Sequence, residues 1–217
     1  ATPLKQDRES LYQAGSLDDL MEGSYNGIAS VGDIISHGDI GLGTFDGLDG
    51  EMMVLDGKCY KARADGTVQL ISPDETTPFA QVSRFDVDGT IDLQGHLNLS
   101  DAEGQIEAAL PTSNAFYLIK ITGTFDNITV RSVPKQAPPY PPLADVVGNQ
   151  TVFHYRGIEG TLVGLWSPSD TSGLSSAEFH FHFLSSDRTK GGHVLNLDLT
   201  DLRAEWDLTS RYVVDLE

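Results

Sequence analysis

Short apolar runs separated by glycine dominate the chain between residues 24 and 88. Several of the separators are Asp-Gly pairs, which are typical of hairpin turns because both residues tolerate the positive φ that a tight turn requires. The pairs are Asp46-Gly47, Asp49-Gly50, Asp56-Gly57, Asp65-Gly66 and Asp88-Gly89. This pattern predicts an antiparallel or mixed sheet over the whole region.

The first 22 residues divide into a polar stretch and a short helix. Residues 1–15 carry no clear hydrophobic period and are interpreted as a loose arm. Ser16 followed by Asp19 resembles a capping box, in which a serine side chain accepts from a backbone N–H of the first turn. A helix is therefore predicted from Leu17 to Glu22.

A second helix is predicted over residues 101–110. Ser100 and Glu103 form a better capping box, and Pro111 would end the helix because proline lacks a backbone N–H. Four later apolar segments have the length and composition of strands. They span residues 115–122, 125–133, 151–157 and 160–166.

A proline-rich segment at residues 134–142 is the best candidate for a domain boundary, because it holds five of the ten prolines. Proline cannot donate to a helix or a sheet, so an extended connector is expected, and recognition by a polyproline-binding partner is the alternative. The predicted fold is α+β and strand-dominated, with a few short helices. It comprises an N-terminal mixed β-sheet domain at 1–142 and a smaller β domain at 143–217.

Charge and composition exclude several classes of function. The chain has 32 acidic and 14 basic residues, a formal net charge of −18, so it repels phosphate backbones and should not bind nucleic acid. No apolar run approaches the ~20 residues that cross a membrane. A soluble protein is expected, cytoplasmic or exported, and Ala1 in place of Met suggests trimming or a removed leader. Cys59 is the single cysteine and is expected to pack inside a strand.

The segment that carries the candidate chemistry alternates between two residue types at 178–183. In a strand, alternate side chains point to opposite faces. Glu178, His180 and His182 would therefore share one face, and three phenylalanines would share the other. The phenylalanine face belongs in a core, so the histidine face must look into a site of another kind.

The next strand supplies a third histidine. A turn over residues 185–192 ends in Gly-Gly, and His193 opens the strand that follows. If His182 pairs with His193, their Cβ atoms lie about 5 Å apart, and His180 lies two positions along the same face. Three imidazoles and an open fourth position describe a catalytic zinc site, although imidazole also suits other divalent transition metals.

The ligand set alone indicates a metal and leaves the reaction open. Histidines on the surface of a half-exposed strand are the simpler interpretation. Carbonic anhydrases use a longer gap to the third histidine, and cupins have a Glu, roughly where Asp187 stands, and a more distant histidine. The other histidines have no partner at ligand spacing and are expected on the surface or in hydrogen bonds. They are His37, His96 and His154.

Three blocks of the sequence resemble the signatures of the alpha-acetolactate decarboxylase family. They occur in the family's order and span most of the chain. The blocks are 43–57 (GTFDGLDGEMMVLDG), 122–136 (TGTFDNITVRSVPKQ) and 180–194 (HFHFLSSDRTKGGHV). The resemblance implies two mixed β-sheet domains with the metal site between them.

The resemblance also implies which residues form the site. It implies zinc on the three histidines, Glu51 and Arg131 pointing into the site, and Thr44 near it. A further acidic residue near the family's C-terminus has no assigned counterpart in this chain. The three proposed metal ligands are His180, His182 and His193.

The implied reaction is the decarboxylation of 2-acetolactate to acetoin. Zinc would chelate the hydroxyl and keto oxygens and stabilise the enediolate that loss of carbon dioxide leaves. Arg131 would hold the carboxylate, and Glu51, with a raised pKa, would protonate the enediolate. The alternatives are another three-histidine metal enzyme, of cupin or hydratase type, and a non-catalytic metal-binding module. A homodimer formed through exposed strand edges is also expected.

Overall fold

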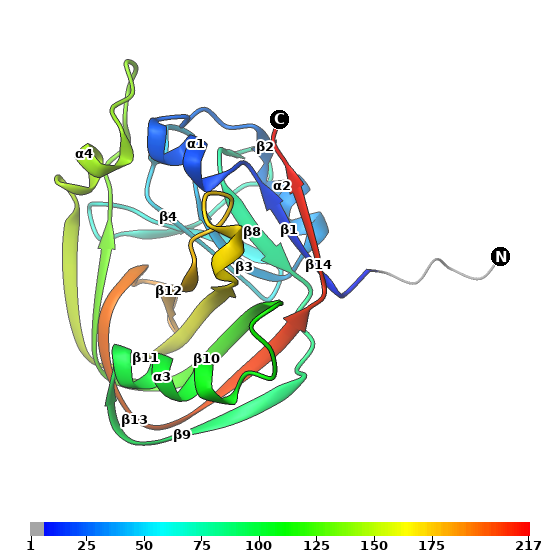
Figure 1. Ribbon diagram of the computed structural model, residues 1–217. Coiled ribbons are helices and arrows are strands. Elements are labelled where there is room, and N and C mark those ends of the chain that lie inside the picture. The colour runs from blue at the N-terminus through cyan, green and yellow to red at the C-terminus, as the bar shows by residue number, and fades with distance from the viewer. Residues whose placement is uncertain (1–6) are drawn as a thin grey trace.

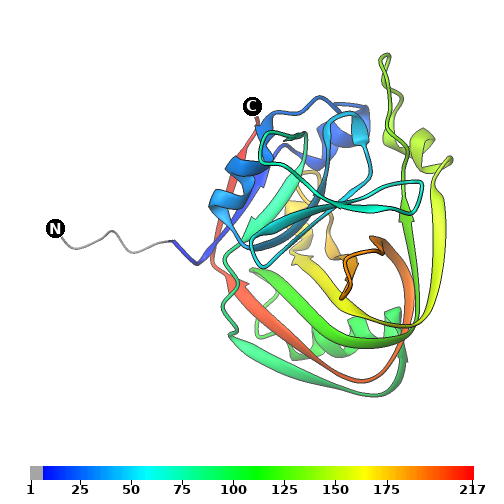
Figure 2. The ribbon, with the colours of Figure 1, turned by 180° about the vertical axis from the view of Figure 1, so that it is seen from behind.

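Two large sheets make up most of the protein, whose computed structural model describes residues 7–217 (Figures 1 and 2). The first sheet has seven strands in the order β14-β1-β8-β3-β4-β5-β6, with β1 and β14 parallel and the other pairs antiparallel. Its strands are β1 (Ser10–Ala14), β3 (Ile40–Thr44), β4 (Glu51–Leu55), β5 (Lys58–Ala62), β6 (Val68–Leu70), β8 (Ala80–Ser83) and β14 (Arg211–Asp215). The strand-dominated α+β fold predicted from the sequence is confirmed.

The second sheet is antiparallel and curls so strongly that it closes on itself. Closure follows because β10 pairs with β11 along one edge and with β13 along the other. Its strands are β9 (Gly89–Asn98), β10 (Phe116–Ser132), β11 (Thr151–Ser167), β12 (Glu178–Ser185) and β13 (Gly191–Thr209). A separate two-stranded ribbon joins β2 (Ala29–Ser30) to β7 (Thr76–Thr77).

The helices are short and lie on the outside of the sheets (Figure 1). They are α1 (Leu17–Glu22), α2 (Val31–His37), α3 (Leu99–Ala109) and α4 (Leu143–Val147), with 3-10 turns η1 (Asp46–Leu48) and η2 (Ser169–Thr171). The apolar face of α3 presents Ala102 and Ile106 to the curled sheet. Within residues 7–217, no helix combines the length and apolar character that crossing a bilayer requires.

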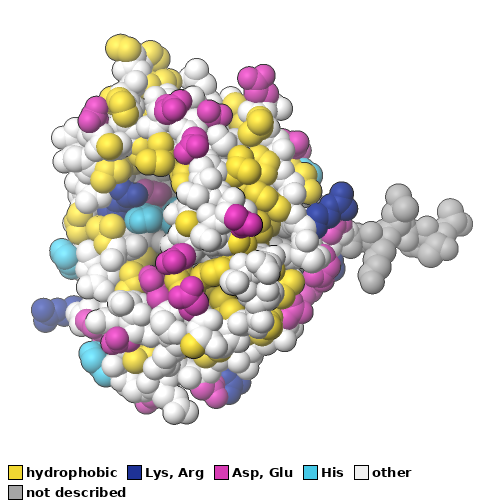
Figure 3. Space-filling view, in the orientation of Figure 1, with side chains coloured by type: hydrophobic (Ala, Val, Ile, Leu, Met, Phe, Trp, Pro, Cys, Tyr) yellow, Lys and Arg dark blue, Asp and Glu magenta, His cyan; other side chains and the backbone are white. Residues whose placement is uncertain are grey.

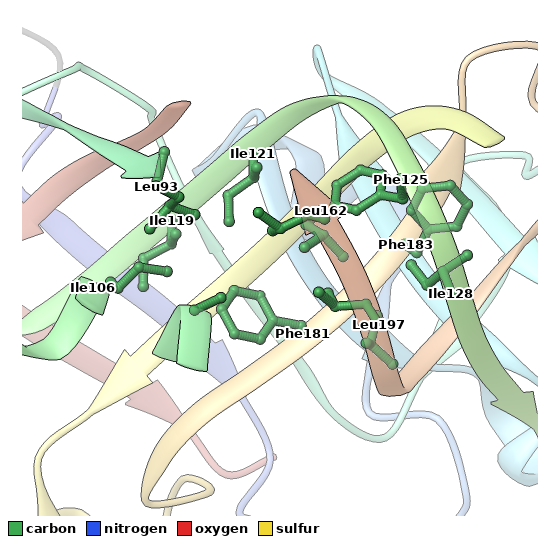
Figure 4. Close-up of a cluster of buried hydrophobic side chains, with 14 of the residues drawn as sticks. Leu93, Ile106, Ile119, Ile121, Phe125, Ile128, Leu162, Phe181, Phe183 and Leu197 are labelled. Atoms are coloured by element: carbon green, nitrogen blue, oxygen red, sulfur yellow. The ribbon is translucent and has the colours of Figure 1, made fainter. Parts of the chain in front are cut away.

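Apolar side chains from the curled sheet fill its interior (Figure 4). Ile119, Phe125, Phe183 and Leu197 are almost completely buried there. A second cluster lies between the two sheets, where residues of β4 and β5 meet residues of β10, β11 and β12. The two sheets are therefore packed face to face over an apolar interface, and this interface fixes β4 against β12.

The N-terminal predictions are partly confirmed. The helix 17–22 forms as predicted, and the Ser16 hydroxyl accepts from the Asp19 N–H at 3.2 Å. The loose arm is wrong for residues 10–14, which form β1 between β14 and β8. The sequence did not indicate this strand because Gln13 is polar and interrupts the apolar pattern. In the fold the Gln13 side chain is buried, and its amide donates to two backbone carbonyls. Residues 1–6 of the predicted arm lie outside the described residues.

Several other elements differ from the prediction. Helix α3 begins at Leu99, because Asn98, and not Ser100, accepts the Asp101 N–H at 2.8 Å. The pairs of strands predicted on either side of residues 123–124 and 158–159 are continuous as β10 and β11. Helix α2, capped by Ser30, lies in a region where only strands were predicted.

The sheets do not follow the boundary predicted near residue 142. Strands β9 and β10 precede that residue and yet pair with β13 and β11 in the curled sheet, and β14 returns to the seven-stranded sheet. A division of the chain into domains 1–142 and 143–217 stays a prediction. Residues 134–142 contain no helix or strand, which agrees with the connector expected there.

Candidate metal centre

The three histidines meet where β12 pairs with β13. His182 lies directly opposite His193 in the register, as the sequence predicted. The Nε2 atom of His180 lies 3.1 Å from Nε2 of His182 and 3.1 Å from Nδ1 of His193. One nitrogen from each ring can therefore face a common point, since these atoms all lie within 4.8 Å of one another.

A backbone carbonyl of the other sheet fixes the ring of His182. The Nδ1–H of His182 donates to the carbonyl oxygen of Met52 on β4 at 2.7 Å. With the proton on Nδ1, the Nε2 lone pair is free to bind a cation. A metal-binding histidine commonly donates its second nitrogen to a carbonyl or carboxylate in this way, which sets its tautomer and orientation.

Burial keeps the three rings neutral. It lowers the pKa of His180 to about 4, with the nearby Arg131 cation acting in the same direction. Burial, followed by neighbouring His180, also holds the pKa values of His182 and His193 well below the ordinary 6.5. Neutral imidazoles packed this closely are the form that binds a divalent transition metal, so the donor set fits zinc.

Glu51, the first residue of β4, brings a carboxyl group from the seven-stranded sheet to the histidines. Its Oε2 lies 3.5 Å from Nε2 of His182, and its Oε1 lies 3.9 Å from Nε of Arg131. Burial raises the pKa of Glu51 to about 7, and Arg131 opposes the rise. The carboxyl group can therefore both hold and release a proton near neutral pH.

Arg131 reaches the site from β10, opposite His193 in the register. Its Nη1 donates to Oε1 of Gln150 at 3.2 Å. Its Nε is buried and has no hydrogen-bond partner among the residues that the structure describes. The guanidinium is therefore held on one side and retains a donor beside the Glu51 carboxylate.

Thr44 ends β3 opposite Glu51 and belongs to the wall of the site. Its hydroxyl donates to the carbonyl of Gly50 at 2.8 Å. Gly50 has a φ of 82°, a left-handed conformation that favours glycine at this turn. Thr44 therefore shapes the turn that leads into Glu51, in addition to lining the pocket that the family resemblance placed near it.

These residues surround a pocket of about 360 Å³. Figure 3 shows a hollow on this face in which cationic, acidic and histidine side chains meet. The remaining wall is mostly apolar and comes from α1, β12, the segments around η1 and α4, and the residues just before β8 and just after β10. Its side chains include Leu17, Leu20, Met21, Leu48, Phe79, Val133, Leu143 and Phe179. A polar floor and an apolar wall suit a small molecule that carries both an anionic group and methyl groups.

All six predicted site residues line this one pocket. Glu178 does not, because its φ of 61° breaks the strand alternation at the first residue of β12 and leaves its side chain exposed. The Met52 carbonyl and Gln150 were not predicted. Neither carries a spacing signal, since a backbone acceptor and a loop amide come to the site only through tertiary packing.

The other histidines lie outside the pocket, as expected. His37 stacks on Tyr12 with ring centroids 3.7 Å apart, and the Nδ1 atoms of His96 and His154 lie within hydrogen-bonding distance of threonine hydroxyls. Cys59 is buried in β5, which also agrees with its predicted packing role.

Comparisons with known proteins point to the same family as the three sequence blocks at 43–57, 122–136 and 180–194. The family model described as alpha-acetolactate decarboxylase matches residues 11–217. The chain is 43% identical over 206 residues to the alpha-acetolactate decarboxylase of Methanosarcina mazei, covering 95% of this chain and 72% of that one. It is 38% identical over 214 residues to the alpha-acetolactate decarboxylase of Methylococcus capsulatus, covering 99% and 82%.

Two solved structures are similar to this chain in fold as well as in sequence. The crystal structure of alpha-acetolactate decarboxylase from Bacillus subtilis superposes with a TM-score of 0.92 at 32% identity, covering 95% of this chain and 88% of that one. A Staphylococcus aureus protein described as similar to alpha-acetolactate decarboxylase also gives 0.92, at 36% identity, covering 94% and 88%.

Proposed function

The chain belongs to the alpha-acetolactate decarboxylase family, and we propose that it converts 2-acetolactate to acetoin with a zinc ion held by His180, His182 and His193. As a member of this family the chain is an enzyme, a carboxy-lyase. The observation that carries the proposal is the meeting of three neutral imidazoles with Glu51 and Arg131 in one pocket. A metal-binding module without activity would not need an acid and a guanidinium at that position.

The substrate determines what the pocket must do. 2-Acetolactate is a β-keto acid with a hydroxyl on the carbon that bears the carboxylate. When the bond from that carbon to the carboxylate breaks, its electron pair moves toward the ketone oxygen and leaves an enediolate. A divalent cation on the three histidines would supply Lewis-acid stabilisation of the negative charge on oxygen.

Arg131 is the residue best placed to bind the substrate carboxylate. Its buried Nε has no hydrogen-bond partner within residues 7–217, and Gln150 already accepts from Nη1, so the group is oriented before substrate arrives. In a protein with a net charge of −18, a local cation is needed to attract a small anion. We assign substrate binding to Arg131 and to Thr44 in the adjoining wall.

Glu51 is the residue best placed to protonate the enediolate. A carboxyl group with a pKa of about 7 is largely protonated below that pH, so it can deliver a proton to the carbon that lost the carboxylate. Since one fixed carboxyl group faces one side of the substrate, the acetoin formed should have a defined handedness.

The test measures acetoin from purified protein and 2-acetolactate before chelation, after chelation and after zinc is restored. Metal content is measured by elemental analysis in parallel. We expect activity to follow bound metal, and His182→Ala to lose both. His154→Ala is the matched control, because His154 is exposed outside the pocket. Folded, metal-loaded protein that makes no acetoin would overturn the proposal, as would His182→Ala with full metal content.

We also expect a homodimer. The seven-stranded sheet ends in β6 on one side and β14 on the other, and open strand edges favour association. Light scattering at several protein concentrations tests this expectation, and a monomeric mass throughout would contradict it. Nucleic acid is not expected as a partner, given the net charge of −18.

A further inference from the structure

Lys61 is a buried cation on β5 that takes no part in the pocket. Its side chain is only 3% exposed, and its ammonium group donates to Asp49 at 3.0 Å and to Glu75 at 2.8 Å. The ammonium also lies 4.5 Å from the ring centroid of Phe45. Burying a lysine is costly unless its charge is paired. The three contacts offset that cost, and the question is what the buried ammonium group does for the fold.

Two of the three contacts belong to a single turn, residues 45–50, between β3 and β4. Phe45 begins this turn and Asp49 stands near its end, so the ammonium group holds both sides of it. The turn contains left-handed backbone at Gly47 (φ 72°), Leu48 (φ 60°) and Gly50 (φ 82°). A left-handed leucine persists only where its surroundings fix it.

The turn joins two residues of the pocket. Thr44 precedes it and Glu51 follows it, and the two are paired across β3 and β4. Asp49 is therefore separated from Glu51 by a single residue, Gly50. Lys61 is the closer of two cations beside the Asp49 carboxylate. The Lys61 ammonium lies 3.0 Å from Oδ2 of Asp49, whereas Nη2 of Arg63 lies 3.8 Å from it on a side chain that is 39% exposed.

We propose that Lys61 is a positioning residue: by holding Asp49 and the ring of Phe45 it fixes the turn 45–50, and so sets where the Glu51 carboxyl group meets the substrate. This inference rests on the proposed function, because it concerns proton delivery by Glu51. Lys61 acts through geometry, since the turn lies between it and the carboxyl group. A displacement of about 1 Å at a reacting group can cost on the order of 100-fold in rate.

The two acidic partners of Lys61 provide a matched pair of variants. Asp49→Asn removes the negative charge of the contact on the turn, at 3.0 Å, whereas Glu75→Gln removes the negative charge of a contact outside the turn, at 2.8 Å. Lys61→Met removes both, and Lys61→Arg restores a cation. Each zinc-loaded variant is assayed for kcat, KM, metal content and the ratio of acetoin enantiomers. The enantiomer ratio reports the direction of proton delivery, which a smaller fraction of folded enzyme would not change.

We expect Asp49→Asn and Lys61→Met to lower kcat by about 10- to 100-fold, with full metal content and more of the minor enantiomer. Glu75→Gln should stay within about threefold of wild type, and Lys61→Arg should recover the wild-type enantiomer ratio. Wild-type kcat and enantiomer ratio in Asp49→Asn would overturn the inference. Equal losses in Asp49→Asn and Glu75→Gln would overturn it as well.

Hydrogen exchange separates this inference from the proposed function. The N–H groups of Gly47, Leu48 and Gly50 donate within or beside the turn, so their exchange reports its opening. We expect exchange at these amides to be about tenfold faster in Asp49→Asn and unchanged in Glu75→Gln, whatever the reaction. Wild-type protein without activity would count against the proposed function, and unchanged exchange in Asp49→Asn would count against the role of Lys61.

Discussion

Replacing Glu51 by glutamine should stabilise the metal-free protein above pH 7 while removing most of the activity. Burial raises the pKa of Glu51 from 4.5 to about 7 against the opposing effect of Arg131. Each pKa unit corresponds to about 1.36 kcal/mol, so ionising Glu51 in the folded protein costs about 3 kcal/mol more than in the unfolded chain. Glutamine has nearly the same shape and does not ionise.

The sign of the effect fixes the pH window. Because the folded-state pKa is the raised one, the stabilising contribution of protonated Glu51 is complete below pH 4.5 and is lost as the pH rises to 7. Urea denaturation of both metal-free proteins should therefore give a difference in unfolding free energy that is about 2.5 kcal/mol larger at pH 8 than at pH 5. Burial lowers the pKa values of the three histidines in the folded protein, so they stay mostly neutral over this pH range and contribute little to the difference.

Activity and a surface control complete the test. With zinc bound, Glu51→Gln should lose about 10²- to 10⁴-fold in kcat at unchanged metal content, the usual contribution of a general acid. Glu107→Gln, on the exposed face of α3, should alter stability by less than about 0.5 kcal/mol at either pH. A stability difference that does not change between pH 5 and pH 8, or full activity in Glu51→Gln, would refute the reasoning.

Other predictions concern packing, the turn and the metal. Phe183 is fully buried against Phe125 at a centroid distance of 5.7 Å, so Phe183→Ala should cost about 3–5 kcal/mol in urea denaturation, and a loss under about 1 kcal/mol would contradict this packing. Thr44→Val leaves the Gly50 carbonyl without its hydroxyl donor and should cost about 1–3 kcal/mol, which Thr44→Ser should restore. Free zinc at 100 times its Kd should raise the unfolding free energy by about 2.7 kcal/mol, and an unchanged urea midpoint with and without zinc would argue against the three-histidine site.

The three-histidine cluster could be predicted from the sequence because its residues are close together in the chain. Strand alternation and a short connection suffice to place His182 opposite His193, and the structure has that pairing. The connection is shorter than the predicted turn at 185–192, because β12 extends to Ser185 and β13 begins at Gly191. Glu51 and Arg131 are different, since no local spacing joins them to the histidines. Only the family resemblance selected them, and the pocket brings them together.

The features that the sequence could not predict depend on packing between distant segments. The acceptor for His182 is a backbone carbonyl 130 residues away, which no residue type marks. In the sequence, Lys61 is an ordinary charged residue of a strand, and nothing marks it as buried. The fold buries its ammonium group between Asp49 and Glu75. Strand β1 was missed for a similar reason, because Gln13 is polar in sequence but buried and hydrogen-bonded in the fold.

The placement of the ligands on one hairpin has a consequence for the order of assembly. The histidines span 13 positions, whereas the contact that joins His182 to β4 closes a loop of 130. Closing a loop ten times longer costs about 2 kcal/mol more in chain entropy. We therefore expect the β12–β13 hairpin to be able to capture metal while the first sheet is still unformed, with Glu51 joining the centre afterwards. Metal uptake and catalytic competence would then be separate events in the maturation of this enzyme, and the second would depend on docking of the two sheets.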